Sequence, residues 1–104
     1  MLRRRGEHTK ILQRDLHPHI RTRMEQRGVT LKEINRTLSE GWDAEDAMEG
    51  TQGKVFVFEY DRVWEGKGYK EKELTVYYKY VGEEMVLLTV KARYGGSFKR
   101  RFEK

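Results

Sequence analysis

His19 and Arg23 lie one helical turn apart in a segment that the sequence predicts to be helical. A histidine can transfer protons near neutral pH, and an arginine four residues further on can hold an anionic substrate beside it. A histidine that borders an apolar stripe is also a common structural hydrogen-bonding group. Two interpretations therefore stand: an acid–base group, or a part of the fold.

The other two histidines, His8 and His17, do not extend this pair into a metal site. His17 and His19 are two residues apart, so they cannot share a helical face, and the i, i+4 spacing of helical zinc ligands is absent. The chain has no cysteine. We expect no metal centre and no cofactor.

A second group of polar side chains lies in the predicted strands between residues 73 and 94. Thr89, Lys91 and Arg93 are spaced two apart and share one strand face, with Tyr77 and Lys79 expected across the hairpin. Cations neutralise phosphates and aromatic rings stack on bases, so this face is a candidate for binding a sugar–phosphate chain. The alternative is a solvated sheet face.

The tyrosines of this segment divide between its two faces. Tyr78 and Tyr80 have the parity of the apolar residues and are expected on the core side. Tyr77 and Tyr94 are the better candidates to stack on a base, although Tyr94 shares the parity of Ala92 and can also turn inward.

Residues 73–94 predict two strands of a hairpin, because β-branched and aromatic residues crowd both halves and Gly82-Glu83 suits the turn. Period-two alternation predicts a core face and an opposite face for the second strand. The core face would carry Val86, Leu88, Val90 and Ala92, and the opposite face Leu87, Thr89, Lys91 and Arg93.

Two short helices are predicted before the strands. Pro18 suits a helix start and Gly28 a left-handed stop after Arg27. Thr30 and Glu33 form a capping box, which opens a second helix that runs to about residue 40. The apolar stripes of the two helices are Leu16, Ile20 and Met24, and Leu31, Ile34 and Leu38.

The remaining segments complete an α+β fold in which a helical hairpin packs on one face of a three- to four-stranded antiparallel sheet. Residues 42–50 are acidic and weakly helical, with their acids expected in solvent. Residues 54–64 predict a strand, and residues 65–72 a polar connection that lacks a P-loop pattern. The uncovered sheet face must be polar, form a site or meet a partner.

Composition predicts one domain of 104 residues with a net charge of +5. Its parts are a basic arm at 1–15, a core at 16–96 and a basic tail at 97–104. A solvated arm is the main interpretation of residues 1–15, and a nucleic-acid contact is the alternative. The absence of cysteine and of a long apolar run predicts a cytoplasmic protein that does not enter membranes.

The run from His19 to Thr30 follows the pattern H-x-x-x-R-M-x-x-R-G-[IV]-[ST], and the chain resembles a prokaryotic family of small uncharacterised proteins. The resemblance continues through residues 64–69 and 88–94 and covers roughly 16–96. That family is similar to RelE-type toxins and, more distantly, to barnase and the colicin nucleases. The resemblance implies a RelE-like fold, RNA as a partner, and an acidic antitoxin-like protein as another.

Metal-independent RNA cleavage needs proton-transfer groups and cations that stabilise a charged phosphorane. On the resemblance, His19 would be the acid or base, while Arg23, Lys91 and Arg93 would stabilise phosphate and Tyr94 would position a base. The alternative function is a non-catalytic RNA- or protein-binding module. His19 lies on a helix and the two strand cations should emerge from the other sheet face, so a shared catalytic pocket requires the helix end to overhang the sheet.

Overall fold

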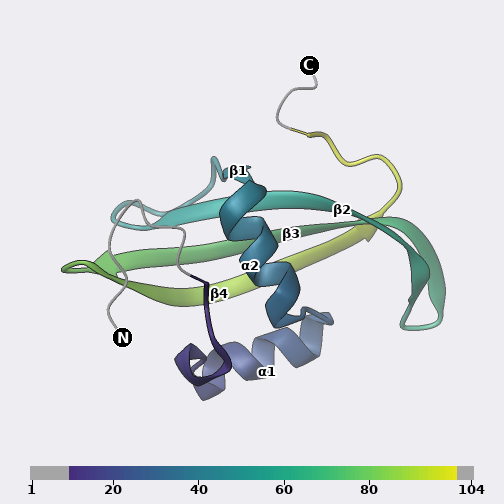
Figure 1. Cartoon of the computed structure of the whole chain (residues 1–104). Coiled ribbons are helices and arrows are strands. Elements are labelled where there is room, and N and C mark those ends of the chain that lie inside the picture. The colour runs from purple at the N-terminus through teal and green to yellow at the C-terminus, as the bar shows by residue number, and fades with distance from the viewer. Residues whose placement is uncertain (1–9, 101–104) are drawn as a thin grey trace.

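A computed structural model describes residues 10–100 of the chain. Four antiparallel strands form one sheet in the order β1-β2-β3-β4, preceded by the helices (Figure 1). The elements are a short 3-10 helix, η1 (Gln13–Asp15), α1 (Pro18–Arg27), α2 (Leu31–Glu40), β1 (Trp42–Asp43), β2 (Gln52–Trp64), β3 (Lys67–Val81) and β4 (Glu84–Gly95). The α+β prediction is confirmed.

Local signals set the bounds of both helices. Pro18 occupies the first position of α1, and Gly28 ends it in the left-handed conformation at φ 69°. Glu33 N–H donates to the Thr30 hydroxyl, and Thr30 N–H donates to the Glu33 carboxylate, which completes the capping box of α2. The predicted starts and stops of the two helices are therefore confirmed.

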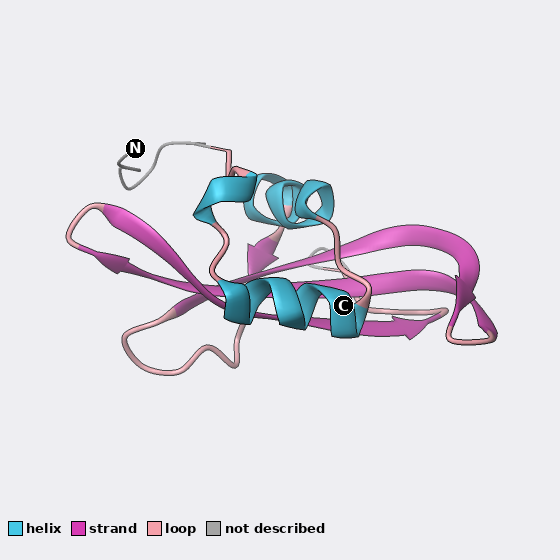
Figure 2. Ribbon diagram, turned by 90° about the horizontal axis from the view of Figure 1, so that it is seen from below, coloured by secondary structure: helices cyan, strands magenta, loops and turns pink. Residues whose placement is uncertain are grey.

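The helices cover one side of the sheet. α2 crosses the face over β2 and β3, while α1 packs against β4 and runs along that edge (Figures 1 and 2). The core between the two layers is apolar, and its most completely buried members include Ile20, Ile34, Leu74, Val76 and Val90. We call the face that carries α2 the helical face and the opposite one the open face.

The predicted connection at 65–72 is wrong, because most of it is strand. β3 begins at Lys67, and only Glu65 and Gly66 form the turn, both at positive φ (48° and 83°). Two successive positive φ values suit a two-residue hairpin whose twist matches the strands. The charges of this segment suggested a loop, but they lie on a long hairpin arm.

The predicted facing of β4 is wrong in its first half. Tyr77 pairs with Thr89 and Tyr78 with Leu87, so Leu88 is an extra residue in the ladder. Such a bulge shifts the alternation by one position. Leu87 therefore belongs to the buried core instead of Leu88, while Lys91 and Arg93 keep the predicted facing.

The described ends of both terminal segments are docked. Ile11 is 2% exposed, and its backbone N–H and carbonyl pair with the amide of Asn35 on α2 at 2.6 and 2.9 Å. Near the other end, Phe98 N–H donates to the Glu71 carboxylate at 2.8 Å, and Arg100 pairs with the same group. Residues 1–9 and 101–104 of the predicted arm and tail lie outside the described residues.

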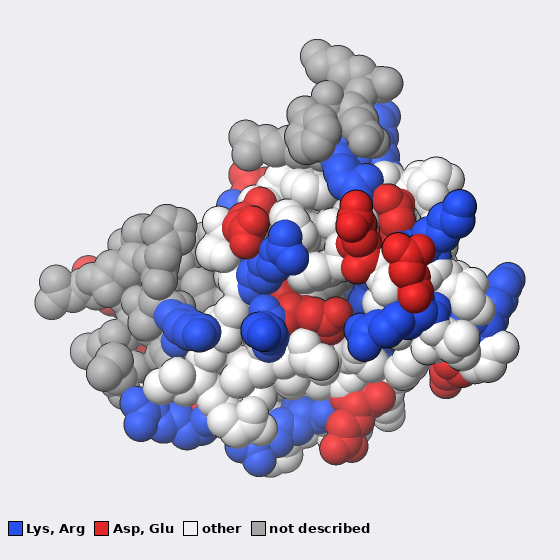
Figure 3. Space-filling view, turned by 45° about the vertical axis from the view of Figure 1, so that its right-hand side comes forward, with Lys and Arg blue, Asp and Glu red and all other residues white. Residues whose placement is uncertain are grey.

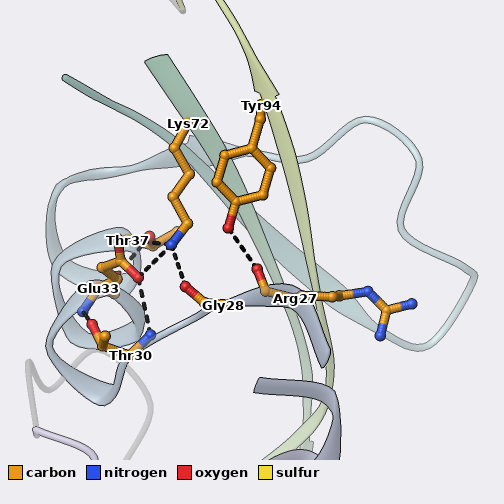
Figure 4. A network of polar contacts seen from close by, with 7 residues as sticks. All are labelled: Arg27, Gly28, Thr30, Glu33, Thr37, Lys72 and Tyr94. Atoms are coloured by element: carbon orange, nitrogen blue, oxygen red, sulfur yellow. Dashed lines mark hydrogen bonds and ion pairs between the residues drawn. The ribbon is translucent and has the colours of Figure 1, made fainter. Parts of the chain in front are cut away.

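Lys72 joins the helical hairpin to the sheet. Its side chain is 1% exposed, and its ammonium donates to both oxygens of Glu33, at 2.8 and 3.0 Å, and to the Gly28 carbonyl (Figure 4). Glu33 also caps α2, so one carboxylate serves the helix start and the sheet. A buried ammonium needs such partners, and these three acceptor atoms give Lys72 a structural role, because they leave it no free reactive group.

Gly28 is required at this junction for space as well as for its backbone angle. A Cβ on it would lie 2.4 Å from a ring carbon of Trp64 and 2.9 Å from the Tyr94 hydroxyl. The Trp64 ring stacks on Tyr94 at 5.2 Å between centroids. The aromatic pair therefore closes directly over the helix–helix turn.

Candidate anion-binding cleft on the open face

Cross-strand rows place the predicted polar residues of β3 and β4 together on the open face. Lys91 pairs with Thr75, and Arg93 pairs with Glu73. Tyr77 pairs with Thr89, one row further along. Residues directly opposite on antiparallel strands contact one another, so these six side chains form one continuous surface.

Five of these six residues, all except Thr89, line a cleft of about 1000 Å³. Ala44, Glu45 and Asp46 of the loop 44–51, which joins β1 to β2, also line it. Figure 2 shows this loop on the side of the sheet away from the helices. The basic residues of the cleft are Lys91, Arg93, Lys99 and Arg100, and its acidic residues are Asp43, Glu45, Asp46 and Glu73. Cations and acids are also interspersed on the side of the molecule shown in Figure 3. Local placement of charge, rather than net charge, must therefore decide what the cleft binds.

Lys91, Asp46 and Tyr77 meet at one end of the cleft. The Tyr77 hydroxyl donates to both Asp46 oxygens, at 2.8 and 2.9 Å, and the Lys91 ammonium lies 3.5 Å from the same carboxylate. The hydrogen bond from Tyr77 holds the pKa of Asp46 below its usual value. Burial, and then the Asp46 contact, raise the pKa of Tyr77, and the neighbouring Tyr77 hydroxyl raises the pKa of Lys91.

Gly53 allows this contact. A Cβ at Gly53 would lie 2.8 Å from the Ala44 Cβ and 3.1 Å from the Tyr77 ring. Its absence lets the Tyr77 ring lie across β2 toward the loop 44–51. The ammonium of Lys91 then lies 5.0 Å from the centre of that ring, within cation–π range.

Arg93 lies two residues from Lys91 on the same face of β4. Its Nε donates to the Glu73 carboxylate at 2.8 Å, and its guanidinium lies 5.0 Å from the Phe98 ring. The side chains of Arg93 and Lys91 remain 68% and 57% exposed. Both cations are thus oriented by neighbours and still face solvent.

The predicted site residues do not all meet. Thr89 and the exposed Lys79 share the open face with Tyr77. His19 is exposed on α1 and Arg23 is half-buried there, and no residue of α1 lines the cleft. The structure therefore does not assemble His19, Arg23, Lys91 and Arg93 into one pocket.

Tyr94 faces the helices. Its hydroxyl donates to the Arg27 carbonyl at 2.6 Å, and burial raises its pKa well above the ordinary range. It stacks on Trp64 rather than standing beside Arg93. Its parity with Ala92 was the sequence signal for this inward facing.

Sequence reasoning missed Asp46 and Glu73 as members of the site. The acids of residues 42–50 were expected in solvent, and Asp46 is 65% exposed, yet it makes the contacts described above. Glu73 lies opposite Arg93, and the hairpin register could have identified that pair from the sequence. The Asp46 contact depends on the path of a loop, for which the sequence offered no signal.

Within residues 10–100, no helix is long and apolar enough to cross a membrane. The same part of the chain contains no group of three or more histidine, aspartate or glutamate residues arranged to hold a metal ion.

The fold and cleft define a small α+β domain with a helical hairpin on one sheet face and a mixed-charge cleft on the other. The chain belongs to the family described as Domain of unknown function (DUF4258), whose model matches residues 16–91. Searches of curated proteins and of solved structures gave no significant match. The uncharacterised family is thus shown, and the likeness to RelE-type toxins stays a prediction.

Proposed function

We propose that this protein is an RNA-binding module that holds a single-stranded sugar–phosphate segment in the open-face cleft. One observation carries the proposal: two exposed cations, Lys91 and Arg93, are held side by side in a cleft that is also lined by the half-buried ring of Trp42 and by Tyr77, which is 9% exposed. Cations neutralise phosphates, and aromatic rings stack on unpaired bases.

The acidic partners of these cations do not prevent such binding. In the Lys91–Asp46 pair both side chains are more than half exposed, at 57% and 65%. Such an exposed pair contributes only about 0–1 kcal/mol, and a phosphate provides a comparable or stronger acceptor, so a phosphate can replace Asp46. Glu73 is only 15% exposed, but Arg93 bonds it through Nε, so Arg93 can keep this pair while its terminal nitrogens contact a phosphate.

The test is the fluorescence anisotropy of a labelled oligouridylate, titrated with protein at several salt concentrations. Replacing Lys91 and Arg93 together with alanine should weaken binding and reduce the slope of log K against log salt by about 1.4, since each neutralised phosphate contributes about 0.7 on single strands. A matched control replaces Lys32 and Lys70, which are exposed and lie outside the cleft. It removes the same charge and should leave most of the affinity intact.

Equal losses in the two double variants would mean that only net charge matters, and would overturn the assignment of the cleft. No binding of RNA at low salt would overturn the proposal itself. Binding of polyglutamate instead of RNA, with the same dependence on Lys91 and Arg93, would indicate that the cleft binds an acidic protein partner such as an antitoxin.

RNA cleavage in the same cleft is the second candidate function. It is favoured by the Asp46 carboxylate, which both the Tyr77 hydroxyl and the Lys91 ammonium contact. Asp46 would take the proton of the attacking 2′-hydroxyl, the Tyr77 hydroxyl would protonate the leaving 5′ oxygen, and the Lys91 ammonium would stabilise the phosphorane. The proton that Asp46 gains would then return to Tyr77. Incubation of total RNA in EDTA tests this: Tyr77→Phe should abolish cleavage and His19→Ala should not. Cleavage that is lost only with His19→Ala would instead assign the acid–base role to His19 on α1.

A further inference from the structure

The open-face cleft contains an anion supplied by its own chain. The Tyr77 hydroxyl donates a bifurcated hydrogen bond to the two oxygens of the Asp46 carboxylate, which also lies 3.5 Å from the Lys91 ammonium. A hydroxyl donor and an ammonium that converge on a pair of carboxylate oxygens can serve a pair of phosphate oxygens in the same way.

One backbone hydrogen bond closes the base of the loop that carries Asp46: the N–H of Ala44 donates to the Gly53 carbonyl at 2.9 Å. A second, from the N–H of Thr51 to the Met48 carbonyl at 2.9 Å, lies within the loop itself. Within residues 10–100, the polar contacts that join residues 45–50 to the sheet are those of Asp46. Displacing one exposed side chain would therefore remove the polar contacts between the middle of the loop and the sheet.

We infer that Tyr77 and Lys91 form an oxyanion subsite, which Asp46 fills in the free chain and a phosphodiester group of RNA fills in the complex. This inference rests on the proposed RNA binding and names one subsite of it. Asp46 is then an internal competitor, and it lowers the affinity of the cleft for every phosphate-containing ligand.

The charge states of the three groups agree with this arrangement. The Tyr77 hydrogen bond lowers the pKa of Asp46, so this group is a carboxylate at neutral pH. Burial raises the pKa of Tyr77, which therefore keeps its proton and donates it. The same hydroxyl raises the pKa of Lys91, which stays cationic when the carboxylate leaves.

The experiment compares Asp46→Ala with Glu45→Ala. Both residues are exposed acids of one loop, both line the cleft, and their removal changes the net charge equally. Anisotropy of a labelled oligouridylate should show Asp46→Ala binding roughly twofold to fivefold more tightly than wild type, since an exposed charge pair that competes with the ligand is worth up to about 1 kcal/mol. Glu45→Ala should change the affinity by less than about twofold, as expected for a screened charge without a direct contact.

Equal gains in the two variants would overturn the inference while leaving RNA binding in place. If wild type and both variants fail to bind RNA, the proposed function is wrong. Binding of inorganic phosphate then tests whether the oxyanion subsite exists. Phosphate-dependent shifts of the Tyr77 ring signals in nuclear magnetic resonance spectra of Asp46→Ala, lost when Lys91 is also replaced by alanine, would support the subsite. Their absence would overturn it.

Discussion

Replacing Lys72 with methionine should be among the most damaging single changes in this chain. Methionine keeps most of the side-chain volume and removes the ammonium. The Glu33 carboxylate then loses two hydrogen bonds, at 2.8 and 3.0 Å, and the Gly28 carbonyl loses its side-chain donor. The change therefore leaves a largely buried charge with one remaining partner, the Thr30 N–H.

The expected cost follows from that geometry. Removing one member of a buried ion pair costs about 3–5 kcal/mol, because the other charge is left uncompensated. Glu33 is 15% exposed and keeps its capping bond, so the lower end of the range, about 3 kcal/mol, applies. For a domain of this size, each kcal/mol lowers Tm by about 4–8 °C, so Tm should fall by about 12–24 °C.

Urea unfolding followed by circular dichroism measures the effect, and a double-mutant cycle assigns its cause. Glu33→Gln keeps an oxygen for the Thr30 N–H, so the capping box survives. The double variant lacks both charges and should therefore be more stable than Lys72→Met alone. Lys70→Met serves as the control, since Lys70 is exposed on the same strand and should shift stability by less than about 0.5 kcal/mol.

Two results would refute this reasoning. A loss below about 1 kcal/mol for Lys72→Met would place the ammonium in solvent rather than in the buried network. A double variant whose loss equals the sum of the two single losses would show that the charges do not interact.

Three further changes test other parts of the structure. Gly28→Ala should cost at least about 2 kcal/mol in urea unfolding, because φ is +69° and the added Cβ meets an indole ring at 2.4 Å. Asn35→Ala removes both bonds to the N-terminal segment and should cost about 1–3 kcal/mol, with faster proteolysis of residues 10–15. Burial raises the pKa of Tyr77, Tyr78 and Tyr94, three of the six tyrosines. Folding therefore favours their neutral form, and this contribution to stability is complete below pH 10 and is lost as the pH rises through the raised pKa values. Tyrosinate absorbance should show these three ionising only above pH 10 while the protein stays folded.

The parts of the fold that the sequence predicted well depend on local chemistry. Pro18, Gly28 and the Thr30–Glu33 pair act on the backbone within a few residues, so their pattern identifies both helices. The facing of Lys91 and Arg93 followed from alternation, and it held because the bulge lies before them. Each of these inferences needed only neighbouring residues.

The parts that could not be predicted depend on residues far apart in the chain. The sequence places Lys72 in a polar connection, because nothing beside it shows that its partner Glu33 lies 39 residues earlier. The bulge at Leu88 interrupts the alternation of inward- and outward-facing side chains, although the residue types along β4 show no break there. Asp46 contacts Tyr77 across a separation of 31 residues, through a loop whose path depends on packing over Gly53.

Photocrosslinking tests the central claim most directly. A short RNA that carries 4-thiouridine would be irradiated with the full chain, and the attached residues would be identified by mass spectrometry. Binding in the open-face cleft predicts crosslinks at Trp42 and Tyr77, which diminish when Lys91 and Arg93 are replaced by alanine. Crosslinks confined to α1, around His19, would contradict the account.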